Sequence, residues 1–463
     1  MKNTWEGTKM QTRIEKDSMG EIRVGADKYW GAQTQRSLEN FPKDVDLMPK
    51  EQIRAIVIVK KAAALVNNKQ GRLDHRRKDA IVAACDQILA GDFDDQFPLT
   101  VWQTGSGTQT NMNVNEVISH IANKSLGEDL IHPNDHVNMS QSTNDVFPTA
   151  MHIASLRAIR DDLIPQLENI SQSFYTSAET FAGIIKTGRT HLQDATPLRL
   201  ADEIRTYGDM IKRDTDYIRQ TSEDLKKLAI GATAVGTGLN TKKDHDKLMG
   251  EVLSELVGFD LESDPNKFLS LGSKQALAKS HGAIKILATD LMKIGEDLRF
   301  LSSGPRTGIG ELIIPSNEPG SSIMPGKVNP TQIEMLMSIC ISVISNDLAI
   351  SMANSLGQLE LNAYMPLIIF KMLDSIKLLT KAVESFDIHL LRGLEANREK
   401  IQENLDKSLM LVTALSTHIG YDKAASLAKF AHEKNLSLRD ANKALEFISD
   451  EDFIKIVDPK KMI

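Results

Sequence analysis

Apolar side chains recur at alternating intervals of three and four residues along much of this chain, which is the period of an amphipathic helix. The clearest run follows Pro265 and consists of Ile284, Leu287, Leu291, Ile294, Leu298 and Leu301. Similar recurrence continues through Ile333–Leu361 and Met365–Leu391. This a/d spacing predicts helices that pack lengthwise in a bundle.

The spacing of prolines supports long helices, because proline interrupts helix interiors. One gap without proline runs from Pro366 to Pro459. Two further helices are expected near the N-terminus, at Lys50–Lys69 and Asp74–Leu89. No alternation of strands with helices, no repeat and no low-complexity linker is evident. The fold class predicted from these patterns is mainly all-α.

Changes in the pattern divide the chain into three predicted regions. Residues 1–139 mix polar turns with helices, residues 140–396 form the long-helix region, and residues 397–463 form a small C-terminal helical domain. In the last region the helices are shorter and are broken at Gly420 and near Asn435.

Composition agrees with this fold class and excludes several functions. The chain has 463 residues, of which 41% are hydrophobic and only 5% aromatic, with 28 glycines and 15 prolines. Few turn residues and few aromatics argue against a β-sandwich. A net charge of −7 without a block of Lys or Arg argues against nucleic-acid binding.

Further classes are excluded by local features. The polar start Met1–Gly7 is not followed by an apolar core, so no signal peptide is expected. No apolar run approaches the ~18 residues that a membrane helix requires. Two cysteines, Cys85 and Cys340, fit a cytoplasmic protein and are too few for an iron–sulfur cluster.

Four segments interrupt the helical pattern with small polar residues, and polar side chains are costly in a core unless they are paired. They therefore predict a shared polar site. The segments are Thr104–Glu116, Ser140–Asp145, Gly188–Pro197 and Gly320–Pro330. The last segment is not a phosphate loop, because five residues separate its glycines and Val328 replaces the required Ser or Thr.

The fourth segment, Gly-Ser-Ser-Ile-Met-Pro-Gly-Lys-Val-Asn-Pro, resembles the signature of the fumarase/aspartase superfamily. Nearly the whole chain is similar to the class II fumarase family, including Gly105–Gln109, Gly326 before Lys327, and Val457–Met462. The resemblance implies a fumarate hydratase of the tricarboxylic acid cycle. Such an enzyme is a lyase that hydrates fumarate reversibly to (S)-malate, with no cofactor and no metal.

The resemblance also implies roles for single residues. Ser321 becomes the catalytic base on a mobile loop, and His191 with Glu334 becomes the pair that activates water or returns the proton. Lys327 stabilises negative charge beside the reacting carbon. Considered without the family, Ser321 would be interpreted as a turn serine, His191 as a packing residue and Glu334 as a solvated helix residue.

Substrate binding by an acidic protein requires local donors, because both carboxylates of the substrate are negative. The residues that match the family as binding residues are Ser106, Thr108, Ser142, Thr143, Asn144, Thr190, Ser322, Lys327 and Asn329. A second dicarboxylate site is matched by His132, Asn134 and Asp135. At that site Asp129 stands where many relatives carry a basic residue.

Two other functions remain open at this stage. An aspartate ammonia-lyase of the same superfamily shares most of these motifs. A non-enzymatic relative that keeps only the fold is a third hypothesis. For assembly, the resemblance implies a homotetramer whose active sites each draw segments from three subunits. The expected ligand is a small dicarboxylate, with neither nucleic acid nor membrane as a partner.

Overall fold

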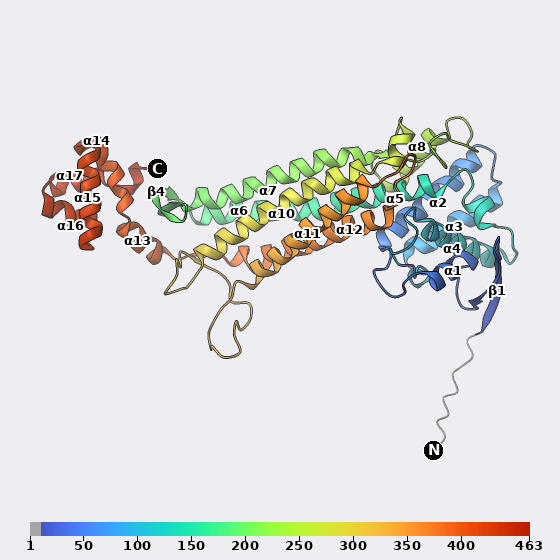
Figure 1. Cartoon of the computed structure of the whole chain (residues 1–463), viewed down its shortest axis with the longest axis horizontal. Helices are drawn as coiled ribbons and strands as arrows, with labels where there is room; N and C mark the ends of the chain where they lie inside the picture. Colours follow the sequence, from blue (N-terminus) through green and yellow to red (C-terminus); the bar gives the residue numbers. More distant parts are fainter. Residues whose placement is uncertain (1–10) are drawn as a thin grey trace, which may run out of the picture. The chain divides into compact units, whose positions relative to one another are not determined.

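Long α-helices dominate the fold, as the three-four spacing predicts (Figure 1). The computed structural model describes residues 11–463. The segment Met1–Gly7, where no signal peptide is expected, lies outside the described residues. Strands are short and form two-stranded sheets only, within the described part of the chain. The prediction of a mainly all-α fold is confirmed.

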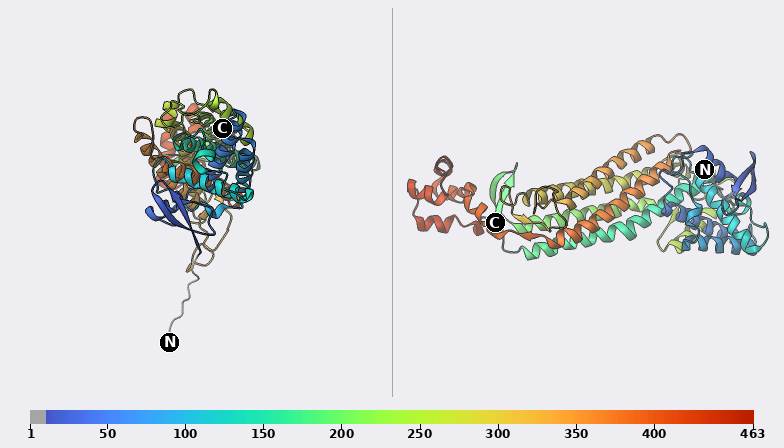
Figure 2. Two further views of the ribbon diagram at one scale, coloured as in Figure 1. Left: turned by 90° about the vertical axis from the view of Figure 1, so that its right-hand side faces the viewer. Right: turned by 90° about the horizontal axis from the view of Figure 1, so that it is seen from below.

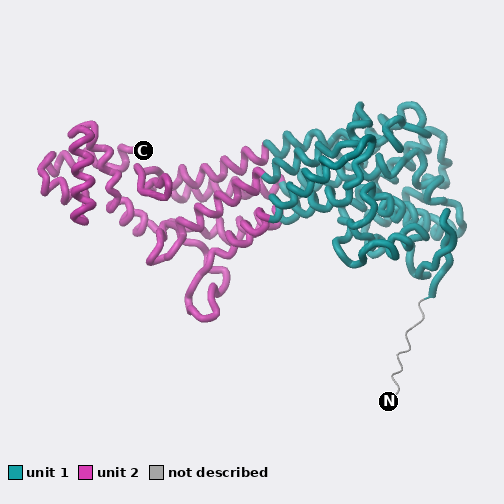
Figure 3. The backbone as a smooth tube through the Cα atoms, in the orientation of Figure 1, with its two compact units in different colours: residues 1–163, 217–285, 342–378 teal, residues 164–216, 286–341, 379–463 magenta. Residues whose placement is uncertain are grey.

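Contacts divide the chain into two discontinuous units (Figure 3). Unit 1 comprises Met1–Leu163, Tyr217–Lys285 and Ser342–Leu378, and unit 2 comprises Ile164–Asp216, Ile286–Ile341 and Leu379–Ile463. This division follows a different criterion from the three sequence regions 1–139, 140–396 and 397–463, which stay a prediction.

Unit 1 contains most of the shorter helices of the N-terminal part. Its α-helices are α1 (Ala32–Asn40), α2 (Lys50–Lys69), α3 (His75–Ala90), α4 (Thr108–Leu126), α5 (Thr143–Arg157), α8 (His245–Val257) and α9 (Lys267–Gly272). Its strands are β1 (Thr12–Asp17) paired antiparallel with β2 (Gly20–Gly25), and β5 (Lys227–Leu228) paired parallel with β6 (Glu262–Ser263). The helices predicted at Lys50–Lys69 and Asp74–Leu89 correspond to α2 and α3, with Asp74 as the N-cap of α3.

Unit 2 contains a β-hairpin, the segment before α11, and the C-terminal helices. Its α-helices are α6 (Ile164–Thr180), α13 (Arg398–Lys407), α14 (Ser416–Ile419), α15 (Tyr421–Lys434), α16 (Leu438–Leu445) and α17 (Asp450–Ile456). Its strands are β3 (Ile185–Thr190) with β4 (Gln193–Arg199), and β7 (Leu312–Ile313) with β8 (Glu395–Ala396), both antiparallel. A separate hydrophobic cluster, which includes Leu415, Leu427 and Phe453, holds the C-terminal helices together.

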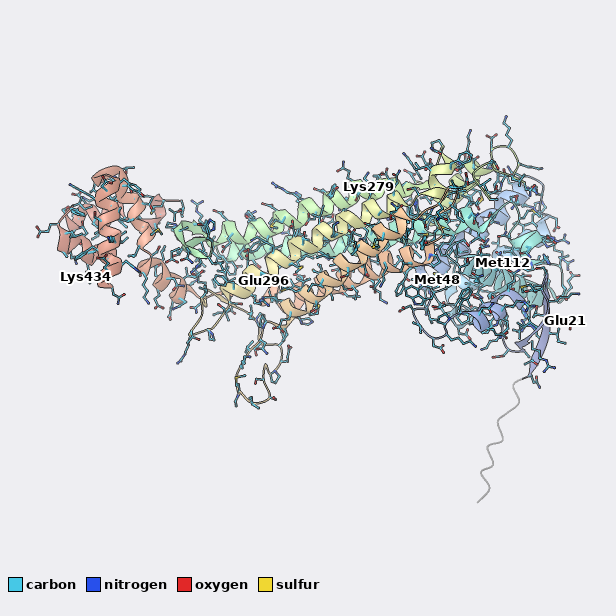
Figure 4. All side chains as sticks on the ribbon, viewed as in Figure 1. Glu21, Met48, Met112, Lys279, Glu296 and Lys434 are labelled. Carbon is cyan, nitrogen blue, oxygen red and sulfur yellow. The ribbon has the colours of Figure 1, made fainter. Side chains whose placement is uncertain are left out.

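Four long helices each contribute to both units: α7 (Leu200–Ser222), α10 (Gln275–Leu301), α11 (Thr331–Ser355) and α12 (Met365–His389). Lys279 and Glu296, labelled in Figure 4, mark the parts of α10 that belong to unit 1 and unit 2. All six residues of the run Ile284–Leu301 are buried, which confirms the predicted packing face of this helix. Figure 2 shows these helices from two further sides.

A buried polar cluster joins three of these helices within unit 1. His281 on α10 contacts the Asp347 carboxylate on α11 through Nδ1 at 3.0 Å, and the Ser375 hydroxyl on α12 through Nε2 at 2.9 Å. Lys285 donates to the other oxygen of Asp347 at 2.7 Å. Because buried polar groups must find partners, this cluster favours one register of the three helices.

The helix α11 differs from the expectation that no segment resembles a membrane span. It is long and apolar enough to cross a membrane by length and composition, and 33% of its most apolar window is buried. One such helix is weak evidence for a span, because core helices of soluble proteins pass the same test. Several of its large apolar side chains are exposed, among them Ile341, Leu348 and Met352.

Candidate active site

Two helices of unit 1 begin beside each other and carry the predicted donors of the first two polar segments. Thr108 is the first residue of α4, and Thr143 is the first residue of α5. The Asn111 side chain on α4 donates to Thr143 Oγ1 at 3.0 Å, which joins the two helix starts. Helix N-termini carry unpaired N–H groups and partial positive charge, so this corner is suited to bind an anion. We call it the α4/α5 corner.

Glycines allow the backbone of the corner to pack closely. A methyl group at Gly105 would lie 1.4 Å from the carbonyl oxygen of Ala363. Gly107, the N-cap of α4, has φ of 76°, and a methyl group there would lie 2.3 Å from the Phe147 ring. Between them the Ser106 and Thr108 hydroxyls are 2.8 Å apart and half-buried. The first predicted binding pair is therefore brought together.

The start of α5 is fixed by a capping box. The Ser142 hydroxyl accepts the N–H of Asn144 at 3.2 Å, while Asp145 accepts the N–H of Ser142 at 2.9 Å. The Asn144 amide donates to the carbonyl oxygen of Ala234 at 2.8 Å. These bonds hold Ser142, Thr143 and Asn144 in one orientation.

Asp145 is fully buried beneath the corner. Burial raises the pKa of its carboxyl to about 6, although N–H groups of Ser142, Thr233 and Gly231 donate to it and oppose the shift. Lys60 on α2 lies near enough to interact with it electrostatically. Lys60 was not among the residues predicted from the sequence. It lies on the apolar face of α2 together with Ile53, Ile56 and Ala63. A lysine on an apolar helix face is rarely buried without a partner, so its position could have indicated a buried polar site.

The fourth polar segment forms a loop of unit 2 between β7 and α11. Ser321 Oγ accepts the N–H groups of Ile323 at 3.3 Å and Met324 at 3.1 Å. Two such bonds favour negative charge on the oxygen. Ser322 and Lys327 are exposed, and Lys327 makes no ion pair with any residue from 11 to 463.

Hydrogen bonds within the Ser321 loop keep it closed on itself. The Gly320 N–H donates to the Lys327 carbonyl at 2.9 Å, and the Asn329 side chain donates to the Gly320 carbonyl at 2.5 Å. A methyl group at Gly320 would lie 2.4 Å from that Lys327 oxygen. The loop surrounds a pocket of about 420 Å³ lined by residues that include Ser321 and Lys327.

The third polar segment forms the β3–β4 hairpin of unit 2, an element that the sequence pattern does not predict. Thr190 and His191 are exposed at its tip, where His191 and Leu192 have φ of 54° and 59°. These angles are those of a tight primed turn, which usually contains Asn or Gly. Because His and Leu are atypical there, the sequence gives no turn signal.

An ionic cluster holds the base of this hairpin. Arg189 binds the buried Glu311 carboxylate with both terminal nitrogens, at 3.0 and 2.7 Å, and Asn404 on α13 donates to the same carboxylate at 3.0 Å. Buried Lys186 bonds Glu203 at 2.9 Å and lies 3.4 Å from Glu311. Burial alone would raise the pKa of Glu311, but these partners lower it overall.

Glu334 is exposed in the first turn of α11. Within the described chain it forms no ion pair with His191. The predicted His–Glu pair is therefore not assembled inside one chain, and it stays a prediction that concerns the assembly.

The residues of the predicted second site lie in unit 1. His132 precedes a short π-helical turn, Pro133–Val137, and its Nδ1 accepts the N–H groups of Asn134 at 3.3 Å and Asp135 at 3.2 Å. Asp129 is exposed nearby in sequence. Among residues 11–463, no group of three or more His, Cys, Asp or Glu side chains is arranged to hold a metal ion.

The structure thus gathers the predicted residues into separate groups. Ser106, Thr108, Ser142, Thr143 and Asn144 share the α4/α5 corner of unit 1. In unit 2, Ser321, Ser322, Lys327 and Asn329 share one loop, Thr190 and His191 share the hairpin tip, and Glu334 begins a helix. Thr143 is buried, and the other residues of these groups are exposed or half-buried.

Comparison with protein families gives two matches. A family of lyases matches residues 20–345, and a family described as the fumarase C C-terminus matches residues 411–463. The first family covers more than half of the chain and includes all four polar segments.

Curated relatives match over nearly the full length. Class II fumarate hydratases of Campylobacter jejuni, Helicobacter pylori and Bacillus subtilis are 54%, 53% and 50% identical to this chain. Each alignment covers 98% of this chain and 99% of the relative.

Solved structures agree with these relatives. A class II fumarase from Schistosoma mansoni is 42% identical, with a TM-score of 0.95 over 98% of this chain and 99% of that one. A cobalt-bound fumarate lyase:delta crystallin from Brucella melitensis is 38% identical, with a TM-score of 0.94 over the same shares. With these matches along its whole length, the chain belongs to the class II fumarase family of lyases.

Proposed function

We propose that this chain catalyses the reversible hydration of fumarate to (S)-malate in the cytoplasm, as part of the tricarboxylic acid cycle. The observation that carries the proposal is the end-to-end similarity to class II fumarate hydratases. The substrate is a dicarboxylate, and no cofactor is invoked.

In the direction of malate dehydration, Ser321 removes the proton from the carbon beside one carboxylate. A free serine hydroxyl is far too weak a base, since each unit of pKa depression needs about 1.4 kcal/mol of stabilisation. The N–H groups of Ile323 and Met324 and the nearby Lys327 ammonium supply part of it. The charge that develops on the carboxylate is stabilised by Lys327 and Asn329.

The α4/α5 corner holds the other end of the substrate. Ser106, Thr108, Ser142, Thr143 and Asn144 offer hydroxyl and amide groups at two helix starts. His191, oriented by Glu334, returns the proton that the departing hydroxide needs, and Thr190 lies beside it. Ser322 completes the set on the Ser321 loop. His132, Asn134 and Asp135 form a second, weaker dicarboxylate site, with Asp129 reducing its affinity.

We further infer that the chain works as a homotetramer whose active sites combine segments of several subunits. On α11, Ile341, Leu348 and Met352 are 56%, 63% and 58% exposed, and they recur at intervals of seven and four residues. Such an apolar stripe favours packing against helices of other copies. His191 and Glu334, exposed and unpaired with each other within one chain, would then meet across subunits.

Shared sites can be tested by complementation. His191→Asn and Lys327→Ala chains, each inactive as a homotetramer, are mixed, unfolded and refolded together. Partial recovery of activity is expected, because some sites receive both wild-type segments. Absence of recovery in verified mixed tetramers would contradict shared sites.

The activity itself is tested by the ultraviolet absorbance of fumarate with purified protein. Malate should yield fumarate and aspartate should not. Fumarate formed only from aspartate would assign an ammonia-lyase instead, and inactivity with both would leave a binding or structural role.

A further inference from the structure

Lys60 is the most deeply buried cation of the α4/α5 corner. It lies on α2 with 0% of its surface exposed, and its ammonium donates to Asn138 Oδ1 at 2.8 Å and Gln141 Oε1 at 3.1 Å. Burial lowers the pKa of Lys60 to about 7, and the charge of Asp145 opposes that shift. Burying an ammonium costs stability, so its presence beside a candidate binding corner invites a functional explanation.

Further hydrogen bonds hold the side-chain amides of Asn138 and Gln141 with their oxygens toward Lys60. Gln141 Nε2 donates to the carbonyl oxygens of Val137 at 3.0 Å and Met139 at 3.1 Å. Asn138 Nδ2 donates to the Gln141 carbonyl at 3.3 Å. Because an ammonium has donors and no acceptor, both amide oxygens must turn toward it.

The orientation of Asn138 then decides that of Asn111. Asn138 Oδ1 also accepts Asn111 Nδ2 at 3.3 Å and Asn115 Nδ2 at 3.2 Å. A flipped Asn111 would set two carbonyl oxygens against each other. The Oδ1 atoms of Asn111 and Asn115 are buried and have no hydrogen-bond partner in the described part of the chain, which is the cost of this orientation.

The orientation of Asn111 in turn sets the direction of its hydrogen bond to Thr143. Its Nδ2 donates to Thr143 Oγ1 at 3.0 Å, so the Thr143 hydroxyl is an acceptor on its inner side. No hydrogen bond from this hydroxyl to another group is present within residues 11–463. Its hydrogen is thus left to donate to a ligand at the start of α5.

We propose that Lys60 is a positioning residue that, through Asn138 and Asn111, turns the Thr143 hydroxyl into a fixed donor for a carboxylate of the dicarboxylate substrate. This inference rests on the proposed binding role of Thr143. It adds a residue that never touches substrate but sets the direction of a donor that does. A preoriented donor binds without reorganisation, which favours substrate affinity.

The test compares steady-state constants for fumarate in the tetramer. Lys60→Met keeps most of the length of the side chain and removes the ammonium donor, and KM should rise about tenfold while kcat stays within about threefold. Lys60→Gln keeps an N–H donor toward Asn138 and should restore KM to within about threefold of wild type. Unchanged KM in Lys60→Met would overturn the proposal.

A second, isosteric variant covers the case in which Lys60→Met does not fold. Asn111→Asp replaces the donor with an acceptor, so Thr143 must donate inward and KM should again rise about tenfold. Wild-type KM in this variant would contradict the relay.

Two controls separate this relay from a loss of stability and from an error in the proposed site. Lys274→Met removes another fully buried ammonium of unit 1, which among residues 11–463 bonds only the backbone carbonyls of Ser270, Leu271 and Ser273, and KM should not change. As a single substitution, Thr143→Val should raise KM. The double variant with Lys60→Met should have the same KM as Thr143→Val. Additive effects would overturn the role of Lys60, whereas wild-type KM in Thr143→Val would overturn the binding role of Thr143 itself.

Discussion

The α4/α5 corner and the Ser321 loop carry different parts of the same proposed chemistry, and their constructions contrast. In the corner, donors lie in the first turns of two helices and are held by buried amides and Lys60. In the loop, no regular element lies between the end of β7 and the start of α11, and Lys327 is exposed. Only a few internal hydrogen bonds keep the loop closed.

The contrast follows the work that each region is proposed to do. Binding a carboxylate gains from donors that need no reorganisation, so helix starts in a packed unit suit it. A base must approach a bound substrate and then release product, so a segment with few packed contacts suits it. If this distinction holds, substitutions in the corner should affect stability and KM, and substitutions in the loop should affect kcat.

The largest effect is expected from removing the base. Ser321→Ala should lower kcat by about 10³-fold, within the range for a general base, while the melting temperature stays within about 2 °C of wild type. The loop contributes little packing, which is why stability should persist. Initial rates of fumarate formation from malate, followed by ultraviolet absorbance, measure kcat, and thermal denaturation measures the melting temperature. A residual kcat above a tenth of wild type would show that another group removes the proton.

Two glycines compare the regions directly. Gly105→Ala places a methyl group against the Ala363 carbonyl in the packed corner and should lower the free energy of unfolding by about 3 kcal/mol or more. Gly320→Ala meets the Lys327 carbonyl in the loop and should instead lower kcat, by about tenfold, with little change in stability.

A third glycine is the matched control. Gly282 lies inside α10 with nothing within 4 Å of an added methyl group, so Gly282→Ala should be neutral or stabilise by about 0.5–1 kcal/mol. Chemical denaturation and initial rates measure all three variants. Equal destabilisation by Gly105→Ala and Gly320→Ala would remove the distinction between corner and loop.

The fold was largely predictable, because it rests on a repeated local pattern. The run Ile284–Leu301 recurs with helical spacing, and each of its residues is buried in α10. The β3–β4 hairpin was not predictable, since its tip consists of His191 and Leu192 rather than Asn and Gly. Its geometry depends on Arg189 and Glu311, which are more than a hundred residues apart.

The sequence allows the candidate site to be proposed as a set of residues, whose roles stay a prediction, but not as a network of hydrogen bonds. The polar segments stood out because small polar residues interrupted an apolar pattern. Lys60 and Asn138 did not, because their importance lies in hydrogen bonds between α2 and a distant turn. Nor could the sequence reveal that His191 and Glu334 form no ion pair with each other within the described residues of one chain.

Buried ammonium groups should give unit 1 a pH dependence that differs between variants. Burial lowers the pKa of Lys274 to about 7 from an ordinary value near 10.5, so the unfolded chain binds more protons between these values. Wild-type stability should therefore gain about 2 kcal/mol from this group between pH 7 and pH 9. Lys274→Met lacks that gain, so its stability relative to wild type should fall over this range.

The same measurement contains its own reference. Between pH 5 and pH 6 the ammonium is protonated in both the folded and the unfolded chain, so the difference between Lys274→Met and wild type should stay constant. Denaturant midpoints at several pH values measure it. A difference that does not change between pH 7 and pH 9 would show that the folded chain does not lower the pKa of Lys274.

The hairpin that carries His191 combines features of the two regions, because its tip is exposed and its base is buried. Arg189→Lys keeps the charge but cannot bind Glu311 with two parallel bonds, so the hairpin should tilt slightly and kcat should fall about tenfold. Arg439→Lys changes an equally bidentate but exposed pair with Asp450, and should leave kcat unchanged. If Arg189→Lys lowers stability by about 2 kcal/mol or more and leaves kcat intact, the hairpin belongs with the packed corner. If kcat falls and stability stays near that of wild type, the Arg189–Glu311 pair positions a catalytic side chain, and the buried base of the hairpin matters for the chemistry at its tip.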